Sequence, residues 1–208
     1  MTPAVGFDLD MTLIDSRPGI RATYRALTAR TGVHVDADLA ASRLGPPLRT
    51  ELAHWFPPAD IERAVTVYRE LYAQHAIAPT VAMPGAEAAL DAVRNRGLRV
   101  VVVTSKIAHL ARMHLDHLGI AADELAGDLF AEGKAAAVTE HGVRWYVGDH
   151  VADMAAARAA EVPGIAVATG PCSPAELRAA GAAHVLPDLR SLPDLLSGIV
   201  VGSGRAAR

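Results

Sequence analysis

The stretch Ala4-Val5-Gly6-Phe7-Asp8-Leu9-Asp10-Met11-Thr12 places two acidic residues directly after an apolar run, near the start of a 208-residue chain. Residues 4–7 have the continuous apolar character of a strand that is covered on both faces, as in a parallel sheet. In open α/β sheets, ligands bind at the carboxyl ends of the strands. We therefore expect Asp8 and Asp10 to lie at a ligand-binding edge.

Further strands and helices alternate along the rest of the chain. Apolar runs predict strands at residues 98–103, 145–147 and 165–168, with a short one at 184–186. Helical patterns occupy residues 85–95, 107–118, 134–141, 151–160 and 174–180, and most end at a glycine that can adopt the left-handed conformation. This alternation predicts an α/β fold with a doubly wound, Rossmann-like parallel sheet.

Residues 16–80 interrupt that alternation. They contain no convincing strand and three helical patterns, at residues 18–30, 47–55 and 59–76. We interpret this block as a helical cap subdomain inserted into the α/β core, which comprises residues 1–15 and 81–198. Residues 199–208 are rich in glycine, alanine and arginine, and we expect a flexible tail there.

Composition narrows the possible partners. The formal net charge is −3, which gives no electrostatic reason to bind nucleic acid or an anionic membrane surface. Cys172 is the only cysteine and has no neighbouring base in the sequence, so we expect an inert loop thiol. The sequence shows no signal-peptide pattern and no apolar run long enough to span a bilayer, so a cytoplasmic monomer or homodimer is expected.

Polar groups also follow the other predicted strands. Thr104 and Ser105 end the second strand just before a helix, where they form either an anion-binding nest or an ordinary helix N-cap. Lys134 lies at the start of the next helix, either as a solvated lysine or as the partner of an anion. Asp149 and Asp153 follow the third strand one helical turn apart, as capping acids or as site residues.

These groups together favour a metal-assisted phosphate site over a set of unrelated turns. Two acids at the end of an apolar strand are costly to bury unless a positive charge lies beside them. Carboxylate oxygens suit Mg²⁺ better than Zn²⁺, which prefers nitrogen and sulfur. Taken alone, the Asp8 and Asp10 pair could be a polar turn, but three successive strands all end in polar groups.

The sequence resembles the haloacid dehalogenase-like (HAD) hydrolase superfamily, in particular its phosphoglycolate phosphatase-like branch. The family's first motif matches Asp8-Leu9-Asp10-Met11-Thr12-Leu13-Ile14-Asp15-Ser16, and its fourth matches Gly148-Asp149-His150-Val151-Ala152-Asp153. Thr104 and Lys134 occupy the positions of the second and third motifs. Family members usually carry glycine where this chain has Met11, and we expect methionine to support the turn with ordinary dihedral angles.

The resemblance implies a phosphatase mechanism. Asp8 would attack phosphorus and form an aspartyl-phosphate, while Asp10 would protonate the leaving oxygen and later activate water. Mg²⁺ would be held by Asp8, the backbone carbonyl of Asp10 and Asp149. An acid at position 10 favours phosphoryl transfer over carbon–halogen cleavage, because an alkoxide needs a proton on departure and a halide does not.

The remaining site residues are also implied by the resemblance. Thr104, the Ser105 N–H and Lys134 would bind phosphoryl oxygens, and Asp153 would support Lys134 and the water on the metal. The cap would close over the site, and Arg43 or Arg49 would pair with a carboxylate or second phosphate of the substrate, unless both are solvated surface residues.

The predicted function is therefore hydrolysis of a small phosphorylated metabolite, similar to phosphoglycolate or a nucleotide. Two alternatives stay open. A phosphomutase of the same fold would keep these acids but transfer the phosphoryl group to a sugar. A catalytically idle regulatory domain would retain the fold without turnover, although the six intact motif residues argue against it: Asp8, Asp10, Thr104, Lys134, Asp149 and Asp153.

Overall fold

The computed structural model describes residues 2–44, 47–130 and 132–202, and it confirms the predicted doubly wound α/β fold. Six parallel strands form the sheet in the order β5 (Glu124–Ala126), β4 (Arg99–Val103), β1 (Ala4–Phe7), β6 (Val143–Gly148), β7 (Gly164–Val167) and β8 (His184–Leu186). The sequence analysis missed β5, because its three half-buried residues lack an apolar run. Strand β1 lies between β4 and β6, so the acids that follow it are near the middle of the sheet edge.

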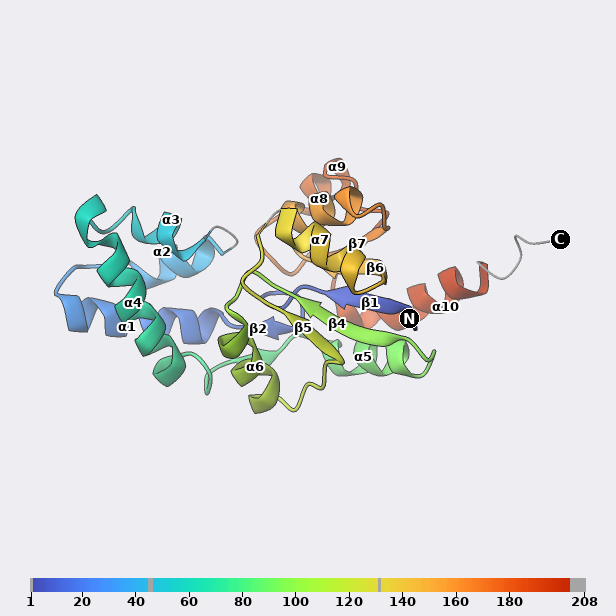
Figure 1. The fold of residues 1–208 in the computed structure, drawn as a ribbon, viewed down its shortest axis with the longest axis horizontal. Coiled ribbons are helices and arrows are strands. Elements are labelled where there is room, and N and C mark those ends of the chain that lie inside the picture. Colours follow the sequence, from blue (N-terminus) through green and yellow to red (C-terminus); the bar gives the residue numbers. More distant parts are fainter. Residues whose placement is uncertain (1, 45–46, 131, 203–208) are drawn as a thin grey trace.

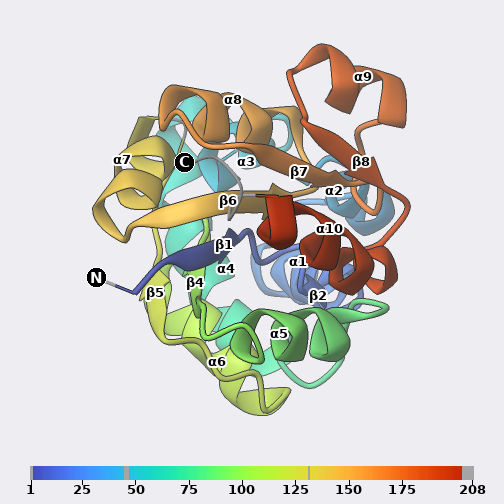
Figure 2. The same cartoon turned by 90° about the vertical axis from the view of Figure 1, so that its right-hand side faces the viewer.

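Helices cover both faces of the sheet (Figures 1 and 2). One face carries α5 (Ala86–Arg94), α6 (Ala108–His117) and α10 (Leu192–Gly202), which share an apolar core with β1 and β4. The other carries α7 (Glu132–Glu140) and α8 (Val151–Ala159), while α9 (Pro174–Ala179) packs beside β8. Helix α10 continues to Gly202, beyond residue 199 where we expected the tail to begin; residues 203–208 lie outside the described part of the chain.

The segment between β2 (Ile14–Asp15) and β3 (Val81–Ala82) is helical, as predicted. It forms α1 (Arg17–Thr31), α2 (Ala37–Ser42), α3 (Leu48–Leu52), the short 3₁₀ helix η1 (Pro58–Asp60) and α4 (Ile61–His75). These helices have an apolar cluster of their own and lie to one side of the sheet (Figure 1). The pattern analysis did not predict α2, whose six residues are too few for a helical period, although Asp36 caps it.

Both connections between the cap and the core run side by side. Strands β2 and β3 pair antiparallel, with Ile14 opposite Ala82 and Asp15 opposite Val81. The cap also touches the core beyond this ribbon, because Leu110 of α6 is buried in the apolar cluster of the cap. No helix in the described ranges is long and apolar enough to cross a membrane.

The turn after β1 differs from our expectation at Met11. Its φ angle is +61°, in the left-handed region, so the predicted ordinary dihedral angles are wrong. The turn is tight because the Met11 N–H donates to the Ile14 carbonyl at 2.8 Å and the Ile14 N–H donates to the Leu9 carbonyl at 3.0 Å. The left-handed conformation costs a residue with a Cβ atom roughly 1–2 kcal/mol. Burial of the Met11 side chain, which is 2 % exposed, offsets this cost.

Candidate active site

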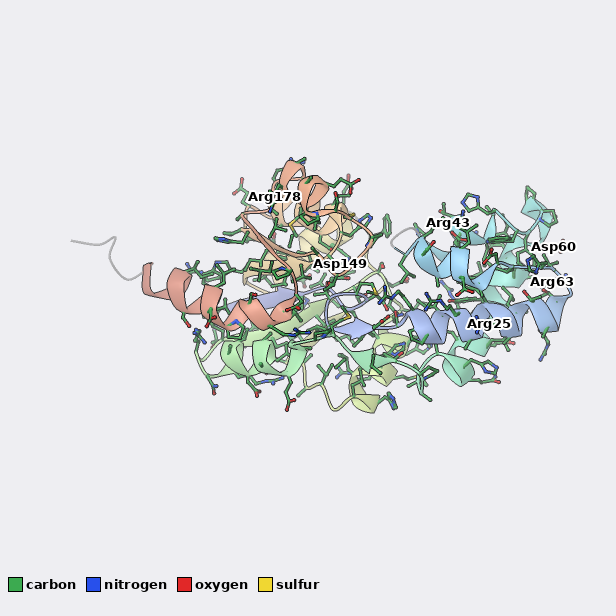
Figure 3. The ribbon with its side chains drawn as sticks, turned by 180° about the vertical axis from the view of Figure 1, so that it is seen from behind. Arg25, Arg43, Asp60, Arg63, Asp149 and Arg178 are labelled. Carbon is green, nitrogen blue, oxygen red and sulfur yellow. The ribbon has the colours of Figure 1, made fainter. Side chains whose placement is uncertain are left out.

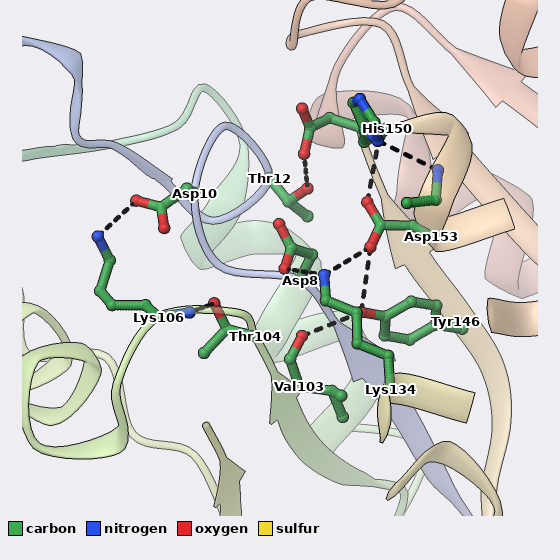
Figure 4. Close-up of polar contacts among 12 residues, drawn as sticks. Asp8, Asp10, Thr12, Val103, Thr104, Lys106, Lys134, Tyr146, His150 and Asp153 are labelled. Carbon is green, nitrogen blue, oxygen red and sulfur yellow. Dashed lines mark hydrogen bonds and ion pairs between the residues drawn. The ribbon is translucent and has the colours of Figure 1, made fainter. Parts of the chain in front are cut away.

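Four charged residues meet at the carboxyl ends of the central strands (Figure 4). Asp8 follows β1 and Asp149 follows β6, while Asp153 comes from the first turn of α8 and Lys134 from the first turn of α7. All four are buried, with between 1 % and 7 % of their surface exposed. The structure therefore brings together the first, third and fourth motifs that the sequence analysis singled out.

Lys134 joins two of these carboxylates. Its Nζ atom lies 2.7 Å from Asp8 Oδ1 and 2.8 Å from Asp153 Oδ1. Burial lowers the pKa of Lys134, but the charges of Asp8, Tyr146 and Asp153 together outweigh burial and leave this pKa well above its ordinary value. The lysine is thus held as a buried cation at the first turn of a helix, where the helix dipole opposes it and the carboxylates stabilise it.

Local hydrogen bonds explain why Asp153 stands where it does. The His150 N–H donates to Asp153 Oδ2 at 3.1 Å, and His150 Nδ1 accepts from the Ala152 N–H at 3.1 Å, which makes a reciprocal cap for α8. A Cβ atom on Gly148 would lie 2.4 Å from the Asp153 Cβ, so the backbone before Asp149 approaches this side chain as only glycine can. His150 also lines the cavity described below.

Three carboxylates form a cluster that fits a divalent cation. Oxygen atoms of Asp8, Asp149 and Asp153 all lie within 4.8 Å of one another. Burial raises the pKa of Asp8 to about 7, with Asp153 adding to the shift and Lys134 opposing it. Burial and then the charge of Asp8 raise the pKa of Asp149 well above its ordinary value. Three buried acids that share one lysine lack positive charge, which a bound Mg²⁺ would supply.

Two neighbours hold Asp149 in this cluster. The Thr12 hydroxyl donates to Asp149 Oδ1 at 3.0 Å. From the loop after β7, Gly170 packs so closely that a Cβ atom there would lie 1.7 Å from Asp149 Oδ2. Neither contact was predicted, because each joins residues that are far apart in sequence.

Asp10 points away from the carboxylate cluster and toward the cap. Its Oδ1 atom lies 3.0 Å from Lys106 Nζ and also accepts a hydrogen bond from the Ser16 hydroxyl. Burial opposes ionisation of Asp10, but the charge of Lys106 and the hydrogen bonds from Ser16 and Lys106 together outweigh burial, so the pKa of Asp10 falls below its ordinary value. The sequence analysis gave Lys106 no role. Its ion pair depends on how the loop after β4 folds back over β1.

The predicted phosphate-binding hydroxyls lie on the loop after β4. Thr104 is 1 % exposed, and its Oγ1 atom accepts from the Lys106 N–H at 3.1 Å. Ser105 lines the cavity. Thr104 therefore shapes the turn that presents Ser105 and Lys106, and the binding of phosphate by Thr104 and Ser105 stays a prediction.

A cavity of about 300 Å³ separates the charged cluster from the cap. Its cap side is lined mainly by aromatic and aliphatic residues: Ile20, Tyr24, Leu44, Leu48, Tyr68 and Tyr72. Arg43 lines it too, and its guanidinium donates to both carboxylate oxygens of Glu51, at 3.0 and 2.7 Å. Arg43 lies on the cap on the side of Asp149, whereas Asp60 and Arg63 lie at the remote end (Figure 3).

The second predicted arginine is placed differently. Arg49 is absent from the cavity lining among the described residues, its side chain is 64 % exposed, and it pairs with Glu62 of α4. Of the two alternatives in the sequence, only Arg43 thus faces the cavity. Its pairing with Glu51, eight residues along the chain, could not be read from the sequence because it depends on the turn between α2 and α3.

Comparison with known proteins gives several matches. The family described as haloacid dehalogenase-like hydrolase matches residues 5–158. Phosphoglycolate phosphatase of Rhodospirillum rubrum is 31 % identical, over 94 % of this chain and 91 % of that protein, and a 5'-nucleotidase of Pseudomonas aeruginosa is 32 % identical over 93 % and 95 %. A predicted phosphatase from Clostridium acetobutylicum has a TM-score of 0.78 at 26 % identity, over 97 % of this chain and 99 % of that one.

Another relative matches over a shorter segment. Tyrosine-protein kinase PtkA of Mycobacterium tuberculosis is 36 % identical over 115 residues, which are 55 % of this chain and 40 % of PtkA. This chain therefore spans about two fifths of the length of PtkA in that match. The family match covers β1, β4, β6 and the cap, and it confirms the resemblance read from the four motifs. The chain belongs to the haloacid dehalogenase-like hydrolase family.

Proposed function

We propose that this protein is a cytoplasmic, Mg²⁺-dependent phosphomonoester hydrolase that acts on a small phosphorylated metabolite, as a monomer or homodimer. The observation that carries the proposal is the buried cluster of Asp8, Asp149, Asp153 and Lys134 at the strand ends, with Asp10 beside it. Such a cluster has one lysine for three acids, so it recruits a divalent cation and, through it, a phosphate group.

Asp8 is the proposed nucleophile. A carboxylate oxygen of Asp8 forms a bond to phosphorus as the bond from phosphorus to the leaving oxygen breaks, and this gives an aspartyl-phosphate. For the first step Asp10 must carry a proton, although Lys106 favours its ionised form in the free protein. Asp10 gives this proton to the leaving oxygen and then removes a proton from the water that hydrolyses the intermediate. Asp8, Asp149 and the Asp10 carbonyl would hold Mg²⁺, which would supply positive charge that offsets repulsion between carboxylate and phosphate.

The other residues hold the phosphoryl group and the metal ligands. Lys134 already touches Asp8, so its ammonium can contact phosphoryl oxygens at the nucleophile. Thr104 and the Ser105 N–H complete this side of the proposed site. Asp153 orients Lys134 and closes the carboxylate cluster.

The substrate enters between core and cap. The cap side of the cavity is largely apolar and aromatic, which suits the organic part of the ester. Arg43 and Arg69 are the cap arginines that line it, and we propose that Arg43 binds an anionic group of the substrate. Relatives named phosphoglycolate phosphatase and 5'-nucleotidase support a substrate similar to phosphoglycolate or a nucleotide.

The test is phosphate release from p-nitrophenyl phosphate and from a panel that includes phosphoglycolate and nucleoside monophosphates. We expect turnover with Mg²⁺ and none with excess EDTA. Asp8→Asn should lower kcat by at least about 10³-fold while the melting temperature stays within a few degrees of the parent. Asp116→Asn is the matched control, since Asp116 is exposed on α6 away from the cavity. Full activity of Asp8→Asn would refute the assignment of the nucleophile.

Product analysis separates the hydrolase from the phosphomutase alternative. A hydrolase releases inorganic phosphate from a sugar phosphate, whereas a mutase returns an isomeric sugar phosphate and depends on the bisphosphate. Isomer formation without phosphate release would show that the protein is a mutase rather than a hydrolase. The role of Asp8 as nucleophile would be unchanged.

A further inference from the structure

Lys106 occupies a junction between the core and the cap. Its Nζ atom lies 3.0 Å from Asp10 Oδ1 and 2.5 Å from the Tyr72 hydroxyl, and it stands 4.6 Å from the centre of the Tyr72 ring. Only 9 % of the Lys106 side chain is exposed. The ammonium therefore has fixed partners on both sides, and its link to Asp10 is visible in Figure 4.

Tyr72 extends this link back into the core. It belongs to α4 of the cap, and its hydroxyl lies 2.9 Å from Nε2 of His114 on α6. An ammonium can only donate, so the hydroxyl accepts from Lys106, and the tautomer of His114 decides the direction of its second hydrogen bond. Burial, with the charge of Lys106 added, lowers the pKa of His114 to about 4, which keeps the ring neutral.

The resulting chain runs from Asp10 through Lys106 and Tyr72 to His114. Every member is at least partly buried, and His114 is fully so. Asp10 has one further anchor, the Ser16 hydroxyl at the start of the cap. Two of the contacts that fix the Asp10 carboxylate thus depend on cap residues, because Tyr72 holds the lysine and Ser16 begins the segment that leads into α1.

We infer that Lys106 and Tyr72 act as a positioning pair, which aims the Asp10 carboxyl group at the leaving oxygen when the cap lies over the site. The inference rests on the proposed function, in which Asp10 gives a proton to that oxygen. Proton transfer needs the acid within hydrogen-bond reach of the reacting atom, and a small misplacement is costly. The pair would thereby make acid catalysis depend on the position of the cap.

Two kinds of ester test the inference. Departure of p-nitrophenolate needs little protonation, whereas an alkoxide needs a proton in the transition state. The value of kcat/KM reports the steps up to phosphoryl transfer, so the two esters differ in their need for Asp10 at that stage. We compare p-nitrophenyl phosphate with the best alkyl phosphate of the metabolite panel.

Lys106→Met should lower kcat/KM about 30-fold or more for the alkyl ester and less than about threefold for p-nitrophenyl phosphate. Lys106→Arg should recover activity to within about fivefold of the parent, because it keeps a cation near Asp10. Tyr72→Phe keeps the ring and removes the hydroxyl, and we expect about a fivefold loss for the alkyl ester alone. The double variant should lose no more than Lys106→Met, because the two residues act in one chain.

Several results would overturn the inference. Equal losses for both esters would show a structural role, and a rise in KM with unchanged kcat would make Lys106 a substrate-binding cation. Additive losses in the double variant would separate Lys106 from Tyr72. Asp8→Asn, measured in parallel, distinguishes the two proposals: an inactive Asp8→Asn with a fully active Lys106→Met refutes only the positioning pair, whereas an active Asp8→Asn refutes the proposed function.

Discussion

The core and the cap present opposite surfaces to the same cavity. On the core side, three buried acids share one lysine, so the charges are unbalanced. On the cap side, the wall is mostly aromatic and aliphatic; its arginines are Arg43, which pairs with Glu51, and Arg69. An unbalanced, buried cluster attracts a cation and an anionic substrate, whereas a mostly apolar wall discriminates by shape. On this ground we propose that the core performs the chemistry and the cap selects the ester.

The two surfaces also differ in how they are held. The acids of the core stand at the ends of strands whose neighbours fix them by backbone pairing, such as the Asp8 N–H that donates to the Val147 carbonyl at 2.8 Å. The cap is connected through the β2–β3 ribbon and contacts the core at few other places, among them Leu110 and Lys106. Changes in the carboxylate cluster should therefore affect every substrate alike, and changes on the cap side should affect substrates unequally.

The largest effect on activity that we predict comes from a change in the core. Gly170→Ala would place a Cβ atom 1.7 Å from Asp149 Oδ2, so the Asp149 carboxylate must move out of the cluster. We expect a loss of about 100-fold in kcat for all substrates and a higher Mg²⁺ requirement. Steady-state kinetics over a Mg²⁺ titration measure both. Gly198→Ala is the control, because a Cβ atom there meets nothing within 4 Å; unchanged kinetics for Gly170→Ala would contradict the packing argument.

A smaller and selective effect is expected in the cap. Arg43→Met removes one of the two cap arginines that line the cavity, so KM for phosphoglycolate should rise about tenfold, which corresponds to about 1.4 kcal/mol, while KM for p-nitrophenyl phosphate changes little. Arg49→Met is the matched control, because Arg49 pairs with Glu62 away from the cavity lining. If both variants raise KM equally, or if Arg43→Met raises KM for both substrates alike, Arg43 is not a specificity residue.

The smallest effect concerns stability rather than turnover. Met11 has a φ angle of +61°, where glycine has no Cβ penalty and alanine does. Met11→Gly should therefore be about 1 kcal/mol more stable than Met11→Ala, the reverse of the usual order for these residues. Urea denaturation of the two variants measures the difference, and both lose the same buried side chain beyond Cβ. An Ala variant as stable as the Gly variant would place Met11 in an ordinary conformation in solution.

Much of the core could be predicted because its signals are local. Apolar runs followed by polar residues marked β1, β4, β6 and β7, and the order of the four motifs was enough to assign Asp8, Thr104, Lys134 and Asp149 to one edge of the sheet. The missed elements include β2, β3, β5 and α2, which have between two and six residues and are too short for a periodic pattern. The helix α10, with 11 residues, was missed as well. The dihedral angle of Met11 escaped prediction because the tight turn, rather than the residue type, imposes it.

The sequence by itself determined the fold, the family and the identity of the acids. The hydrophobic pattern of a strand and the polar residues that follow it lie within a few residues of each other, so both can be recognised locally. Only the tertiary structure decided which partners those acids have. It turned Asp10 toward Lys106, joined Lys106 to Tyr72 across 34 residues of chain, and set Arg43 rather than Arg49 on the cavity wall. These contacts depend on how the cap packs over the β4–α6 loop. That packing requires two surfaces to fit each other, and their residues are far apart in the sequence.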